Sequence, residues 1–367
     1  MYIRTLLLCT ILVSIYSWTT IDANRNECPC ALKTSCDPIE YNGKEIFGYV
    51  LKSNFTVWST FNFNKLTTIS LVDFIDDELM CLSHELRVRV ITRETFKLKY
   101  ISNQSYIDEW LTKRINVAQD HYLDGINLYV DDPIDSNDPR AEQLTQLVKM
   151  VTDKFHAKLP KSIVVFNVPY SPYNQKKMGV NGKNYQYEKI AQIVDRLFIM
   201  NYDQRKQAID DDDKCMSGPN SNYYITMGSL LAYQEMNFPM NKMILGLPYY
   251  AHEYKCVTYD NIRCYIEREQ YRGINCSSNV ANIIPYNQMN EIDNLPGMFW
   301  DEISGTCIYH YVEKSYGYVY QIWLDRNDTL QLKFILAERN GLGGIGMWCL
   351  NYMNPGSWDH VPQYKLS

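Results

Sequence analysis

The sequence is poor in the features that mark nucleic-acid-binding and membrane-spanning proteins. Its 36 Lys and Arg residues are outnumbered by 42 Asp and Glu residues, the net charge is -6, and no basic run occurs. A nucleic acid partner is therefore not expected. Beyond residues 6–18, no segment is long and apolar enough to cross a bilayer, which takes about 20 residues. We expect no membrane partner once the N-terminus is removed.

The chain also lacks the usual signs of a metal site. It has no CxxC pair and only six histidines, whereas structural zinc sites gather closely spaced Cys and His ligands. We predict no metal and no cofactor, with a zinc site among the cysteines as the alternative. No internal repeat and no low-complexity linker marks a domain boundary.

The N-terminus is typical of a secretory signal peptide. Arg4 precedes the apolar run at residues 6–18, and small residues follow near Ala23. We predict that residues 1–23 are removed, leaving one domain over residues 24–367. An uncleaved membrane anchor is the alternative. The secretory route leads to the lysosome or to the extracellular space.

The cysteine content agrees with that route. Cys9 lies in the predicted signal peptide, and ten cysteines remain, an even number that predicts disulfides in a secreted chain. Their clusters at residues 28–36 and 256–307 predict two stapled regions, with the connectivity open. Four Asn-x-Ser/Thr sequences are compatible with glycosylation, at Asn54, Asn103, Asn275 and Asn327.

Strand-like and helix-like stretches alternate along the chain. Eight apolar, β-branched segments predict strands at Ile46–Leu51, Leu66–Ile75, Arg87–Ile91, Leu123–Val130, Ser162–Val168, Arg196–Tyr202, Lys242–Tyr250 and Gly344–Leu350. Most are separated by a segment of helical periodicity, which predicts an α/β fold, a (β/α)₈ TIM barrel. A doubly wound sheet is the alternative. Residues 251–325 break the alternation, hold four cysteines and predict an insertion after strand seven.

The fourth predicted strand ends in a carboxylate. Asn127, Tyr129 and Asp131 share one face of the strand, because side chains alternate along it. In a parallel barrel the carboxyl ends of the strands carry the chemistry. Taken alone, this stretch also fits a buried strand that runs into an acidic turn.

Motifs at four strand ends change that interpretation. In chain order they are the Asp-Gly-Ile-Asn sequence from Asp124, the Tyr-Asp pair at Tyr202 and Asp203, Pro-Tyr-Tyr at 248–250 and Gly-Ile-Gly-Met-Trp at 344–348. Together they resemble glycoside hydrolase family 18, the chitinase-like barrels, and most closely its chitobiase-like members. The resemblance implies a glycosidase that cleaves β-1,4-linked N-acetylglucosamine by substrate-assisted catalysis, in which the acetamide oxygen of the sugar attacks its anomeric carbon.

The resemblance also implies roles for individual residues. The family motif ends in a Glu that donates a proton to the leaving oxygen, and an Asp two residues earlier orients the acetamide. Here Asp131 stands in place of the Glu and Tyr129 in place of the Asp. Tyr202 matches the tyrosine that binds the acetamide, and Trp348 matches the floor beneath the sugar. The remaining predicted substrate-binding residues are Asp124, Asn127, Asn167 (where chitobiase-like members carry Asp), Asp203 and Tyr249.

The two departures predict weakened or lost activity. Asp131 is one methylene shorter than Glu, and a misplacement near 1 Å can lower a rate about 10²-fold. Tyr129 carries no negative charge to stabilise a developing cation, and losing such a partner typically lowers the rate about 10²- to 10³-fold. Asp132 is an alternative acid, although on a continuing strand it faces away from the lumen.

Three functional hypotheses follow. The protein is a chitobiase-type hydrolase of chitobiose cores or chitin oligomers with weak retained activity, or a secreted binder of N-acetylglucosamine oligosaccharides that does not cut them. In the third hypothesis the cleft is vestigial, and the surface or the insertion binds a protein. The sequence leaves the retention of hydrolysis and the oligomeric state open.

Overall fold

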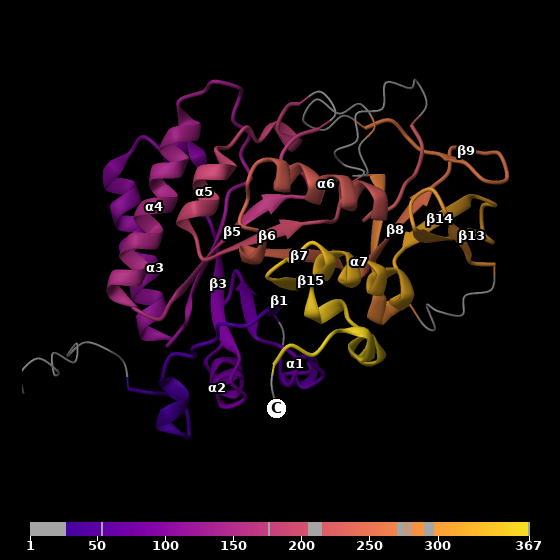
Figure 1. Cartoon of the computed structure of the whole chain (residues 1–367). Coiled ribbons are helices and arrows are strands. Elements are labelled where there is room, and N and C mark those ends of the chain that lie inside the picture. The colour runs from indigo at the N-terminus through magenta and orange to yellow at the C-terminus, as the bar shows by residue number, and fades with distance from the viewer. Residues whose placement is uncertain are drawn as a thin grey trace, which may run out of the picture.

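The computed structural model describes most of the chain after its N-terminus (Figure 1). The described residues are 27–52, 54–174, 177–204, 215–269, 276, 280–289 and 297–365. The predicted signal peptide and the glycosylation sequence at Asn275 lie outside them. Within the described part, no helix combines the length and the apolar character needed to cross a membrane.

Eight parallel strands close into a barrel, in the order β1-β15-β7-β6-β5-β4-β3-β2. They are β1 (Glu45–Leu51), β2 (Thr68–Val72), β3 (Arg89–Thr95), β4 (Gly125–Tyr129), β5 (Ile163–Pro169), β6 (Arg196–Met200), β7 (Met243–Pro248) and β15 (Gly344–Trp348). Each overlaps a segment predicted as a strand, although β3 runs to Thr95, beyond the predicted end at Ile91. The (β/α)₈ barrel is therefore confirmed, and the doubly wound sheet is excluded.

The strands are apolar on both faces because both faces are buried. On β5, Val164 and Phe166 pack with the large core under the helices, while Val165 packs in a separate cluster inside the barrel. The Phe198 ring fills the lumen between β7 and β15. A Cβ atom at Gly246 or Gly346 would lie within 2.4 Å of that ring, so the two glycines make room for it.

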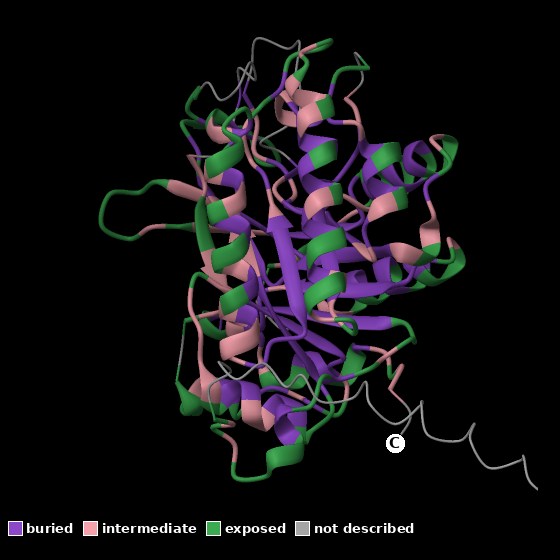
Figure 2. Ribbon diagram, turned by 90° about the vertical axis from the view of Figure 1, so that its left-hand side faces the viewer, coloured by how far each residue is buried: buried purple, intermediate pink, exposed green. Residues whose placement is uncertain are grey.

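Helices cover the outside of the barrel, and their exposed faces ring its buried strands (Figure 2). They are α1 (Phe55–Trp58), α2 (Asp77–Glu85), α3 (Gln104–Asp120), α4 (Arg140–Lys158), α5 (Tyr187–Ile193), α6 (Tyr223–Glu235) and α7 (Asn327–Arg339). Side chains of Asp76, Asn103 and Asn222 accept backbone hydrogen bonds at the starts of α2, α3 and α6. Of the glycosylation candidates, Asn54 and Asn103 are exposed and Asn327 is half-buried.

The predicted insertion follows β7 and forms its own sheet beside the barrel (Figure 1). Five antiparallel strands lie in the order β11-β8-β14-β13-β12, and β9 pairs with β10. Their bounds are β8 (Tyr250–Lys255), β9 (Thr258–Tyr259), β10 (Cys264–Tyr265), β11 (Asn282–Pro285), β12 (Phe299–Asp301), β13 (Thr306–Val312) and β14 (Val319–Leu324). The disulfide Cys256–Cys264 lies within this insertion, and Cys215–Cys276 ties it to the segment between β6 and α6. Cys307, predicted as part of this staple, is instead a buried thiol on β13.

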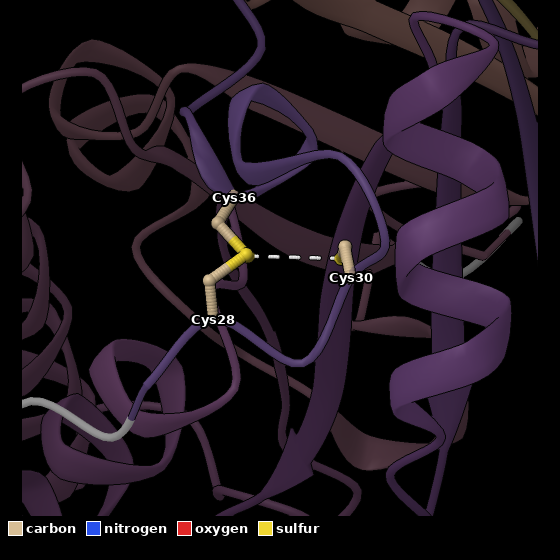
Figure 3. A group of neighbouring side chains, drawn as sticks. All are labelled: Cys28, Cys30 and Cys36. Atoms are coloured by element: carbon tan, nitrogen blue, oxygen red, sulfur yellow. Dashed lines mark hydrogen bonds between the residues drawn. A yellow bond between two sulfur atoms is a disulfide. The ribbon is translucent and has the colours of Figure 1, made fainter.

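The N-terminal segment carries the other two disulfides. Cys28 pairs with Cys36, and Cys30 pairs with Cys81 of α2. The sulfurs of Cys30 and Cys36 lie only 3.6 Å apart, and Figure 3 shows the three N-terminal cysteines together. Because all three are oxidised, they offer no thiolate for zinc in this state. Cys349, at the end of the barrel, is a second buried thiol.

Candidate functional site

A cavity of about 250 Å³ opens where the barrel strands end. It is lined by Tyr49, Arg93, Tyr129, Asp131, Asn167, Asn181, Lys183, Met200, Tyr202, Asp203 and Trp348. Six of these were predicted as site residues: Tyr129, Asp131, Asn167, Tyr202, Asp203 and Trp348. The predicted residues Asp124, Asn127 and Tyr249 do not line it.

Asp131, predicted as the candidate acid, is held by two donors. The Tyr129 hydroxyl donates to its Oδ1 at 2.9 Å, and the Lys183 Nζ lies 2.9 Å from the same oxygen. The Lys183 side chain is only 3% exposed, whereas that of Asp131 is 33% exposed. Lys183 lies in the segment after β5, and its backbone pairs with that of Ile134. The Asp131 carboxylate is therefore part of an ion pair with Lys183.

Arg93 brings a second cation to the cavity. Its guanidinium carbon lies 5.2 Å from the centre of the Tyr129 ring and 5.8 Å from that of Trp348. The Lys183 Nζ lies 5.5 Å from the same Tyr129 ring. Tyr129 is thus a neutral ring next to two cations.

Two aromatic rings form one wall of the cavity. Tyr202 and Trp348 stack with their ring centres 5.9 Å apart and their planes at 27°, and Tyr49 meets Trp348 edge-on at 4.8 Å. Burial raises the pKa of Tyr202 well above its ordinary value. Its hydroxyl therefore stays protonated at working pH and can donate a hydrogen bond to a ligand.

Asp203 is fixed by the start of the insertion. Its Oδ1 accepts a hydrogen bond from the Tyr250 hydroxyl at 2.8 Å and lies 3.2 Å from Nε2 of His252. The Tyr254 hydroxyl lies 3.3 Å from the other ring nitrogen of His252. Asp203 itself has a left-handed backbone, with φ 53°. A carboxylate connected to a histidine therefore borders the cavity.

Tyr249 faces away from Asp203 and the cavity. It is buried in the core outside the barrel, where its ring meets that of Tyr286. The predicted seventh strand ran without a break to Tyr250, but β7 ends at Pro248 and β8 begins at Tyr250. The chain turns between them, so it is Tyr250 that contacts Asp203. The break at Pro248 was the sequence signal for this difference.

Asn127 lies one layer below the cavity and supports it. Its Nδ2 donates to the Tyr49 hydroxyl at 2.7 Å, and that hydroxyl donates to Asn167 Oδ1 at 2.7 Å. Asn127 and Tyr49 are fully buried or nearly so. Asn127 thus orients two residues of the cavity wall without reaching the cavity.

Asp124 lies at the opposite end of β4. Its Oδ1 accepts from the Ile39 backbone N–H at 2.9 Å, and its Oδ2 accepts from the Val90 N–H at 2.7 Å and lies 2.8 Å from His84 Nε2. These contacts join the N-terminal segment, β3 and α2. Asp124 therefore holds the barrel together rather than facing a substrate.

Asp132, the alternative acid, also lies outside the cavity lining. Its Oδ2 accepts a hydrogen bond from the Leu98 backbone N–H at 3.2 Å.

Sequence patterns did not single out Arg93, Lys183, Tyr250 or His252. For Arg93 a signal existed, because Arg89, Ile91 and Arg93 alternate into the barrel lumen on β3. For Lys183 no signal existed, because irregular backbone brings it to Asp131.

The chain matches one protein family and several known relatives. The model of the glycosyl hydrolases family 18 matches residues 98–352. Di-N-acetylchitobiase of Homo sapiens is 30% identical over 334 residues, covering 89% of this chain and 84% of that protein. Probable di-N-acetylchitobiase 2 of Dictyostelium discoideum is 29% identical over 341 residues, covering 89% and 86%.

A solved structure shares the same fold. The family 18 chitinase from Cycas revoluta, in complex with (GlcNAc)3, superposes with a TM-score of 0.67 at 14% identity, covering 86% of this chain and 99% of that one. The strand-end motifs, the closed barrel and the match over residues 98–352 all agree. This chain belongs to glycosyl hydrolase family 18.

Proposed function

We propose that the cavity binds an N-acetylglucosamine residue of a β-1,4-linked oligosaccharide, and that hydrolysis of the glycosidic bond is strongly reduced or lost. Family membership and the names of the relatives support the ligand class. The stacked Tyr202 and Trp348 rings support it further, because apolar ring faces suit the faces of a sugar. The chitobiose core of a glycan or a chitin fragment supplies such a residue.

The contact between Lys183 and Asp131 carries the second half of the proposal. A general acid must hold a proton within reach of the leaving oxygen. Asp131 instead meets an ammonium group at 2.9 Å, which favours its ionised form. Its side chain is also one methylene shorter than the Glu of the family motif, so its oxygen stops short of the bond to be cleaved.

Tyr129 removes a second element of the family mechanism. The intermediate expected in substrate-assisted hydrolysis carries positive charge on the sugar, which a neighbouring carboxylate stabilises. Tyr129 is neutral, and its hydroxyl is already donated to Asp131. Each change alone lowers a rate about 10²-fold or more, and residues that act as a unit do not add.

The alternative is a weak hydrolase in which Asp131 serves as the acid. Its 33% exposure favours this alternative, because solvent can weaken the pairing with Lys183. The two functions differ in turnover and not in binding, so one set of variants separates them.

The test is release of N-acetylglucosamine from di-N-acetylchitobiose and its longer oligomers at about pH 4 to 6. The natural protein is compared with Tyr129→Asp/Asp131→Glu and with the same variant carrying Lys183→Met. We expect the triple variant to exceed the natural protein by about 10²-fold or more. We expect the double variant to fall between them, because Lys183 still pairs with the restored Glu.

Binding is measured beside turnover by titration calorimetry. We expect the natural protein to bind the oligomers without turnover, and Trp348→Ala to lose that binding. If the natural protein turns over as fast as the triple variant, and Asp131→Asn abolishes that activity, the weak-hydrolase alternative holds. If it neither binds nor cleaves, the cavity has no glycan function, as in a vestigial cleft.

The disulfides and the exposed Asn54 and Asn103 support an oxidising, secretory compartment for this function. We propose the lysosome or the extracellular space.

A further inference from the structure

The geometry of Arg93 points to an acidic ligand. Resting on the function proposed above, we propose that the cavity selects N-acetylglucosamine oligosaccharides that carry an anionic group on the bound sugar, a carboxylate or a sulfate. Arg93 is the residue that recognises this group.

Arg93 is buried enough to be ordered and remains accessible from the cavity. Its side chain is 17% exposed, and it lines the cavity between Tyr129 and Trp348. Its Nε is buried and has no hydrogen-bond partner. The guanidinium therefore keeps hydrogen-bonding capacity that the unliganded protein does not use.

The other charged groups of the cavity already have close partners. Lys183 contacts Asp131, and Asp203 accepts from Tyr250 and lies near His252. Arg93 pairs instead with Asp73, at 3.3 Å from Nη2, and the Asp73 side chain is 71% exposed. An ion pair with such an exposed carboxylate contributes little. Of the two cations that line the cavity, Arg93 is therefore the one whose carboxylate partner is exposed to solvent.

The position of Arg93 determines which part of a ligand it meets. Its guanidinium lies 5.8 Å from the centre of the Trp348 ring, so it faces a sugar that stacks on this ring. It lies 5.2 Å from the Tyr129 ring, where active members of the family are expected to carry the assisting carboxylate. The charge beside Tyr129 is therefore positive, which repels a cationic intermediate and attracts an anion.

Arginine suits this role because of its shape. The planar guanidinium presents parallel N–H donors that match two oxygens of a carboxylate or sulfate. A neutral sugar offers only single hydroxyl or carbonyl acceptors. The preference for an anionic sugar should therefore depend on Arg93 and weaken as salt is added.

The test uses three matched ligands: di-N-acetylchitobiose, its 6-O-sulfate, and the same disaccharide oxidised to a carboxylate at that carbon. Dissociation constants are measured by titration calorimetry at low and physiological salt for the natural protein, Arg93→Gln and Lys149→Gln. Lys149, on the exposed face of α4, is the matched control for the loss of one positive charge. Thermal unfolding checks that each variant is folded.

We expect at least one anionic ligand to bind the natural protein about tenfold or more tightly than the neutral disaccharide. The preference should vanish in Arg93→Gln and persist in Lys149→Gln. The sulfate and carboxylate ligands show which anion is preferred.

Equal binding of all three ligands, or a preference that survives in Arg93→Gln, overturns this inference and leaves the proposed function standing. Binding of the anionic ligands alone supports the inference and refutes binding of neutral chitobiose. Binding of none overturns both.

Discussion

Lys183 and Asp131 form an ion pair whose two partners differ in burial. Lys183 is almost fully buried, and Asp131 is one-third exposed. Removing the exposed partner leaves a buried ammonium without its carboxylate, which is a severe loss. Removing the buried partner leaves a carboxylate that water can reach. The two single substitutions therefore differ in their effect on stability.

We predict that Asp131→Asn lowers the free energy of unfolding by about 3 kcal/mol or more, and Lys183→Met by about 1 kcal/mol or less. Urea unfolding monitored by tryptophan fluorescence measures both. Asp153→Asn is the control, since its ion pair with Lys149 is exposed and should contribute little. An equal loss for Asp131→Asn and Lys183→Met would show that solvent screens the pair.

At the scale of single residues, motif positions could be predicted and long-range partners could not. Tyr129 and Asp131 were predicted as site residues from a strand motif, and both line the cavity. Lys183 reaches the cavity from irregular backbone after β5, where no periodicity fixes the direction of a side chain. The partner that most changes the chemistry of Asp131 was therefore not evident from the sequence.

Single elements were predictable where their pattern was regular. Strand β5 is buried throughout, and its apolar run indicated this directly. The junction of β7 and β8 shows the limit, because Pro248 interrupts what was predicted as one strand and reverses which tyrosine contacts Asp203. A one-residue change of register moves a side chain to the opposite face.

Two disulfides that involve the insertion close loops of different length. Cys215 and Cys276 are 61 residues apart, and Cys256 and Cys264 are 8 residues apart. In the chain-entropy account a longer loop stabilises more. We predict that replacing the first pair by alanines lowers the free energy of unfolding by about 4 kcal/mol, and replacing the second pair by about 2.5 kcal/mol.

Denaturant unfolding of the two double variants measures this difference. The pair Cys28 and Cys36 offers an internal control, because it also spans 8 residues and should match Cys256 and Cys264. A larger loss from a short loop than from the long one would mean that local packing, and not chain entropy, sets the contribution.

The whole molecule divides its polar groups between the two ends of the barrel. The cavity lies at the carboxyl ends of the strands. At the amino ends, Glu45 is buried beside Arg89 and Arg196, and Asp124 accepts hydrogen bonds from three segments. Alternating strands and helices predicted this polarity, since parallel strands all point one way. The same polarity places Asp124, at the start of the predicted strand, at the amino ends, whereas the family resemblance had predicted it to bind substrate.

This polarity makes stability and binding separable. Asp124 lies in the strand-four motif but makes its contacts at the amino ends of the strands. We therefore predict that Asp124→Asn destabilises the protein without weakening ligand binding. An amide in its place turns one acceptor into a donor facing the buried Val90 N–H and His84. Leaving such groups unpaired lowers the free energy of unfolding by about 2–3 kcal/mol, seen as a lower melting temperature.

Calorimetry on the folded Asp124→Asn variant should give an affinity within about twofold of the natural one, while Trp348→Ala loses binding. A tenfold weaker affinity in Asp124→Asn would mean that the two ends of the barrel are coupled, and that the motif acts as one unit from Asp124 to Asp131.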